Sequence, residues 1–136
     1  MYLSIGAHLW SSIFDVGGFL GHVWVKAKLT NPLSGAETEE EALVDTGATY
    51  TVIPSETYEK LRLKIVGEKD VETAKGLARL EESFALIEIE GKRGLTPLLV
   101  SKDLKDLLIG VLTLEALGLK VDPTTGKLKE ARILLL

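Results

Sequence analysis

The 136-residue sequence contains no cysteine and no glutamine, and it has one asparagine (Asn31) and one methionine (Met1). The absence of cysteine excludes disulfide bonds and thiolate metal sites. The scarcity of heat-labile side chains, together with 26% charged residues, is typical of proteins from hot environments. The two histidines, His8 and His22, have no third ligand near them in the sequence. We therefore predict no metal site and no cofactor.

Long apolar runs and clusters of basic residues are also missing. No segment reaches the roughly 18–20 uninterrupted apolar residues that a membrane-spanning helix needs. The start of the chain has no basic region like that of a secretory signal. The net charge is −4, and the lysines and arginines are scattered. We expect a cytoplasmic protein that binds neither nucleic acid nor a membrane.

The chain has the length of one domain, and 46% hydrophobic residues are enough for a core. Apolar side chains alternate with polar ones from Val23 to Leu29, which predicts a strand with one buried face. Further strands are predicted at 37–44, 65–73, 84–90, 95–101, 107–110 and 119–121. Short helices are predicted after Pro54, capped by Ser55, and over 111–117, ended by Gly118. Short strands separated by frequent turns predict an all-β fold, a closed barrel or sandwich.

The first 21 residues differ from the remainder of the chain. Four glycines interrupt them, and their apolar residues follow no clear period, although a helix over Ala7–Phe14 is one candidate element. We therefore predict an N-terminal extension at 1–21, which serves as an arm or a lid, and one domain at 22–136.

The tetrad Asp-Thr-Gly-Ala at 45–48 is found once in the sequence, directly after the apolar residues 42–44. A carboxylate in apolar surroundings costs several kcal/mol unless it is paired, hydrogen-bonded or protonated. Asp45 is therefore a candidate functional residue. A second motif, two apolar residues and a glycine at 108–110, precedes the second predicted helix.

These two motifs, with Leu-Gly-Leu-Lys-Val-Asp at 117–122, resemble the retropepsin family of retroviral-type aspartic proteases and their cellular and prokaryotic relatives. The resemblance implies a closed β barrel, formed by a single-domain protomer with a flap hairpin. It also implies a homodimeric aspartic endopeptidase, in which the Asp45 carboxylates of two subunits activate water to cleave a peptide or an unfolded protein. Two carboxylates that share a proton supply both the base and the acid.

The resemblance also assigns roles to individual residues. Asp45 is the catalytic carboxylate, Thr46 braces the loop across the dimer, and Gly47 allows close approach of the backbone. The predicted substrate-binding residues are Ala48, Thr49, Lys75, Gly76, Leu77, Ile109 and Gly110. Of these, Gly76 is the expected tip of the flap, which holds an extended peptide by main-chain hydrogen bonds. The apolar tail 132–136 is expected to pair with the tail of the partner subunit.

Retroviral members carry an acidic residue and an arginine where this chain has Thr49 and Val111. The loss of both favours the cellular and prokaryotic branch. One alternative is a catalytically inactive peptide-binding or dimerisation module, and another is that Asp45 only caps a turn. Residues 45–49 also resemble the D-x-G-x-T phosphate loop of actin-like and sugar-kinase ATPases. Those proteins need two large lobes, for which 136 residues are too few.

Overall fold

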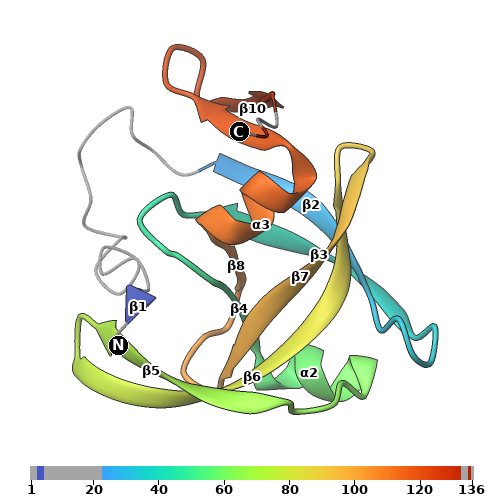
Figure 1. Ribbon diagram of the computed structural model, residues 1–136, viewed down its shortest axis with the longest axis vertical. Coiled ribbons are helices and arrows are strands. Elements are labelled where there is room, and N and C mark those ends of the chain that lie inside the picture. The colour runs from blue at the N-terminus through green and yellow to red at the C-terminus, as the bar shows by residue number, and fades with distance from the viewer. Residues whose placement is uncertain (1–2, 5–22, 133–134, 136) are drawn as a thin grey trace.

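A computed structural model describes residues 3–4, 23–132 and 135, and these residues form a mostly β fold with two short helices (Figure 1). The strands are β1 Leu3–Ser4, β2 Val23–Thr30, β3 Glu37–Val44, β4 Thr51–Pro54, β5 Gly67–Thr73, β6 Gly76–Ile89, β7 Lys92–Ser101, β8 Leu107–Ile109, β9 Leu119–Asp122 and β10 Lys127–Glu130. The helices are α2 Ser55–Leu61 and α3 Val111–Leu117. The predicted helix Ala7–Phe14 lies outside the described residues.

Eight strands form one sheet in the order β1-β5-β6-β2-β3-β8-β4-β7. Because β6 also pairs with β7, the six strands from β6 to β7 close into a barrel. A separate antiparallel pair, β9 and β10, follows α3. The predicted all-β closed barrel is therefore confirmed.

The strand predicted from Val23 has the expected faces. It pairs antiparallel with β3 from Val23 opposite Val44 to Thr30 opposite Glu37. Ala27 and Leu29 are fully buried, whereas Trp24 on the other face is 49% exposed. Alternation of side chains across the strand thus places one face of β2 in the core.

The β6 strand begins at Gly76, well before the predicted start at residue 84. Its first part pairs with β5 from Gly67 opposite Glu82 to Thr73 opposite Gly76, in a hairpin that extends from the barrel at the lower left of Figure 1. We call this hairpin, residues 67–82, the flap. Much of its first part is exposed, with charged Arg79 and Glu81 among its residues, so it lacks the apolar alternation that a core strand shows.

Other details of the elements also differ from the predictions, among them the start of β7 and the cap of the first helix. The β7 strand begins at Lys92 instead of residue 95, because the turn before it uses Glu90 and Gly91, both with positive φ, as in a tight hairpin. The predicted Ser55 cap of the first helix was wrong. Pro54 holds the N-cap position, Ser55 is the first helical residue, and no side chain caps this end.

The core divides into two clusters of buried apolar side chains. The larger one fills the barrel and includes Leu29, Ile53 and Ile87. The smaller one, here called the site cluster, consists of Leu43, Ala48, Val52, Val71, Leu99 and Leu108. In the part of the chain that the structure describes, no helix is both long enough and apolar enough to cross a membrane.

Candidate active site

The loop between β3 and β4 carries the Asp-Thr-Gly-Ala tetrad, and Asp45 is its first residue. Asp45 is only 1% exposed. Its N–H donates to the carbonyl oxygen of Ile109 at 2.9 Å. This bond continues the parallel pairing of β3 with β8, in which Val44 lies opposite Ile109. Parallel strands end at the same edge of a sheet, so the two motifs of the sequence meet there.

Hydrogen bonds inside the loop orient the Asp45 carboxylate. The N–H of Gly47 donates to Oδ1 of Asp45 at 2.8 Å, and the N–H of Ala48 donates to the Asp45 carbonyl oxygen at 3.1 Å. An aspartate that accepts from the backbone two residues later forms a compact turn. Asp45 and Ala48 are buried, whereas Thr46 and Gly47 between them are exposed.

The start of α3 completes the support of this loop. The N–H groups of Val111 and Leu112 donate to the carbonyl oxygens of Ala48 and Thr49 at 2.8 and 3.0 Å. The first N–H groups of a helix have no partner within the helix, and here the loop supplies two of the missing acceptors. The structure therefore joins the predicted residues Asp45–Thr49 to Ile109 and the helix after Gly110.

Gly110 allows this close approach. A Cβ atom at this position would collide with the carbonyl oxygen of Tyr50 and would stand 2.9 Å from that of Thr49. The backbone of Gly110 is extended, with φ −99°, a conformation that any residue can adopt. Lack of space, and not an unusual backbone angle, therefore requires glycine here.

The predicted flap residues lie at the end of the hairpin, away from the barrel core. The two-residue turn consists of Ala74 and Lys75, so Gly76, the expected tip, directly follows the tip. Gly76 has φ +114°, which suits glycine. The hydroxyl of Thr73 donates to the Gly76 carbonyl oxygen at 2.9 Å and accepts from the Lys75 N–H at 3.1 Å. Lys75, Gly76 and Leu77 are all exposed.

The arms of the flap contact the region of the tetrad through the site cluster. Val71 in β5 belongs to this cluster together with Ala48 and Leu108, and Ala78 and Leu80 in β6 pack against it. The flap is thus packed, through buried apolar side chains, against the loop that follows Asp45. This packing fixes the base of the flap beside the tetrad.

Tyr50, the last residue of the loop, interacts with charged residues of the flap. Burial raises the pKa of the Tyr50 hydroxyl, and the negative charge of Glu82 and a hydrogen bond to it raise this pKa further. Lys69, whose Nζ lies 3.7 Å from Oε1 of Glu82, acts in the opposite direction. No local pattern predicts this contact, because Tyr50 and Glu82 belong to segments far apart in the chain.

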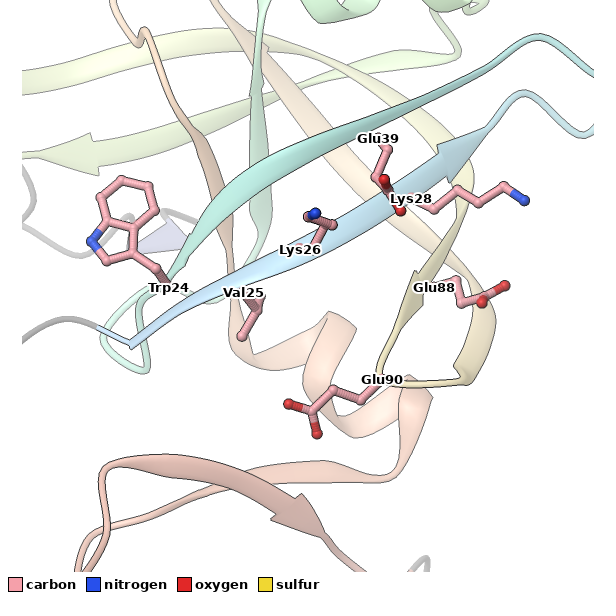
Figure 2. Close-up of a pocket in the computed structure, with 7 residues that line it drawn as sticks. All are labelled: Trp24, Val25, Lys26, Lys28, Glu39, Glu88 and Glu90. Atoms are coloured by element: carbon pink, nitrogen blue, oxygen red, sulfur yellow. The ribbon is translucent and has the colours of Figure 1, made fainter.

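A pocket of about 460 Å³ lies elsewhere, on the outer face of β2 (Figure 2). Its lining residues are Trp24, Val25, Lys26, Lys28, Glu39, Glu88 and Glu90. None of them is a predicted site residue, and they combine two lysines with three glutamates, so no single ligand charge is favoured. Among the described residues, no three His, Cys, Asp or Glu side chains are grouped as metal ligands.

Residues 34–116 match the protein family described as "gag-polyprotein putative aspartyl protease". The chain belongs to this aspartyl protease family. The match covers the Asp-Thr-Gly-Ala tetrad and Gly110, which argues against the phosphate-loop interpretation of residues 45–49. No curated protein matches the chain.

This member of the aspartyl protease family also resembles solved structures. The EIAV protease in complex with the inhibitor HBY-793 shares 18% identity at a TM-score of 0.62, over 87% of this chain and 97% of that one. The foamy viral protease–reverse transcriptase with an RNA/DNA hybrid shares 17% identity at a TM-score of 0.52, over 65% of this chain and 11% of that one. The simian foamy virus (mac) protease shares 20% identity at a TM-score of 0.48, over 64% and 86%. The EIAV likeness confirms the predicted retropepsin-like fold.

Proposed function

We propose that this protein is an aspartic endopeptidase that works as a homodimer, with one Asp45 from each subunit at a two-fold axis. The observation that carries the proposal is the buried Asp45, held at the end of β3 by Ile109 and Gly47 in a member of the aspartyl protease family. The chain has a single Asp-Thr-Gly motif, and a two-fold axis brings the same residue of both chains together.

In this dimer, two carboxylates share one proton, because like charges at close range do not both ionise readily. The ionised Asp45 takes a proton from a water molecule, whose oxygen attacks the carbonyl carbon of the scissile peptide bond. The protonated Asp45 donates to the carbonyl oxygen. The C–N bond then breaks, and the leaving nitrogen receives a proton from the dyad, which yields a carboxylic acid and an amine.

The substrate is a peptide or an unfolded protein in extended form. Its backbone adds to the flap, and its side chains lie between the flap and the loop that carries Asp45. We assign Thr46 to a brace between the two loops and Gly47 to main-chain contact with substrate, since both are exposed beside the buried Asp45. Thr49, Ile109 and Gly110 shape the floor, and Lys75, Gly76 and Leu77 close over it from the flap.

The N-terminal extension acts as an arm on the flap. Leu3 and Ser4 pair in parallel with Val71 and Glu72 of β5, along the edge of β5 that β6 does not occupy (Figure 1). A free strand edge is where an extended peptide adds to a sheet. Leu3 and Ser4 of this extension therefore compete with substrate for this edge. Pairing of the tails 132–136, the cytoplasmic location and the hot environment remain predictions.

The test compares the wild type with Asp45→Asn on unfolded casein and a mixed peptide library, from acidic to neutral pH, at high protein concentration. We expect cleavage by the wild type alone, strongest below neutral pH, where the dyad keeps its shared proton. Light scattering measures whether both proteins are dimers. If neither protein cleaves although both are dimers, the inactive peptide-binding module replaces this proposal. Equal cleavage by both would exclude Asp45 as the catalytic group.

A further inference from the structure

Three buried threonine hydroxyls form a chain beneath the loop that carries Asp45. Thr51 begins β4, Thr113 lies in α3, and Thr96 lies in β7; their exposures are 0%, 0% and 1%. The hydroxyls of Thr51 and Thr113 are 2.5 Å apart, and those of Thr113 and Thr96 are 3.2 Å apart. The chain therefore connects three elements that are distant in the sequence.

The hydrogen bonds in this chain have a defined direction. The N–H of Gly110 donates to the Thr51 hydroxyl at 3.1 Å. Each hydroxyl has one proton to donate. Because Thr113 donates to Thr96, Thr51 is the donor to Thr113. The order of donation thus runs from Gly110 through Thr51 and Thr113 to Thr96.

The chain of threonine hydroxyls attaches the last part of the loop, and Asp45 is attached separately at its first part. At the first end, the N–H of Asp45 is bound to Ile109, and at the second end Thr51 is bound to Gly110, the next residue after Ile109. Both ends of the loop are therefore attached to two adjacent residues, Ile109 at the end of β8 and Gly110 directly after it. Thr113 contacts neither Asp45 nor Ile109 in these bonds, so it acts on them only through Thr51 and Gly110.

We propose that Thr113 is a positioning residue for the reaction, which holds the Asp45 loop at its catalytic geometry through the hydroxyl of Thr51. This inference rests on the proposed function, and it adds a residue to which the sequence resemblance gives no role. A displacement of reacting groups by about 1 Å lowers rates by about 100-fold. A change confined to loop position therefore affects kcat more than KM.

The test replaces Thr113 with Val, which keeps the shape of the side chain and removes the hydroxyl. Thr113→Ser, which keeps the hydroxyl, is the rescue variant. The matched control is Thr57→Val in α2, because Thr57 is also buried at 3% exposure and also donates a hydrogen bond, to Glu40 at 2.8 Å. All variants are assayed well below their melting temperatures.

We expect kcat to fall about 10- to 100-fold in Thr113→Val with KM changed little, and to recover in Thr113→Ser. Thr57→Val should retain the wild-type kcat. Amide hydrogen exchange gives a second readout that needs no activity: the N–H groups of Asp45 and Gly110 should exchange faster in Thr113→Val and not in Thr57→Val. An inactive wild type with this exchange pattern would refute the protease function but support the positioning role. Unchanged exchange at both amides, or an equal kcat loss in Thr57→Val, would overturn the inference.

Discussion

Gly110 lies so close to Tyr50 that a single methyl group on Gly110 would collide with the Tyr50 carbonyl oxygen. The contact joins the residue that follows β8 to the loop that follows β3. The loop after β3 and the residue after β8, which together form the candidate active site, are therefore in direct contact through backbone atoms. Even the methyl group of alanine at position 110 should therefore disturb the site.

Gly110→Ala should destabilise the protein by about 1–3 kcal/mol, because the added methyl group overfills a packed region and must push the loop away. Urea denaturation measures this loss, and the protease assay should show reduced activity at temperatures where the variant remains folded. Gly67→Ala is the control, since a Cβ there would meet only Oε1 of Glu82 at an ordinary 3.5 Å. Equal stability of the two variants would contradict the prediction.

Ser4→Pro should release the N-terminal arm from the flap. Proline removes the N–H of Ser4 and disfavours strand pairing. If the arm competes with substrate through a hydrogen bond worth about 1 kcal/mol, kcat/KM should rise about fivefold. Ser12→Pro makes the same chemical change within residues 1–21 but outside β1. The competing-arm proposal fails if both proline variants show the same kcat/KM.

Asn31→Ala should lower the free energy of unfolding by about 1–3 kcal/mol. The buried Asn31 side chain donates to the carbonyl oxygens of Leu61 and Arg62 at 2.9 and 3.1 Å, at the end of α2. Its loss leaves these carbonyl groups without that donor. Thermal and urea denaturation check the value. Ser34→Ala, which removes an exposed acceptor of the Ala36 N–H, should change stability by less than about 0.5 kcal/mol.

Tyr50 should make the stability of the protein depend on alkaline pH. Burial, followed by Glu82, raises its pKa above the ordinary 10.0, so the folded state holds the phenol proton more tightly than the unfolded state. The resulting stability is present below pH 10.0 and is lost as the pH rises through the folded-state pKa. Tyr50→Phe should lose less stability over this range than the wild type, as urea denaturation at a series of pH values will show.

Glu82→Gln separates the two main causes of this shift. Removal of the negative charge should lower the Tyr50 pKa, but burial should keep it above the ordinary value. NMR titration of ring-labelled tyrosine measures the pKa, with Tyr50→Phe to assign the signal. No change in the Tyr50 pKa would mean that Glu82 does not act on this hydroxyl.

Much of the barrel and the centre of the site could be predicted from local patterns. Alternation in β2 specified its buried face, and the apolar residues before Asp45 and Gly110 marked the ends of β3 and β8. The long β6 strand was only partly predictable. Its first part lies in the flap, where few side chains are buried, so the period-two pattern that depends on a buried face is weak.

Local sequence patterns marked the candidate residues for the chemistry, a single Asp-Thr-Gly-Ala tetrad and a second glycine motif, and the alternation that produces a β barrel. How these parts are held depends on contacts between segments that are distant in the sequence. The pairing of Asp45 with Ile109, the chain of Thr51, Thr113 and Thr96, and the contact of Tyr50 with Glu82 all join distant segments. The alternation of apolar residues indicates which face of a strand is buried, because every second side chain along a strand points to the same face. It does not indicate which buried hydroxyls form hydrogen bonds with one another, because those contacts depend on how closure of the barrel aligns the strands.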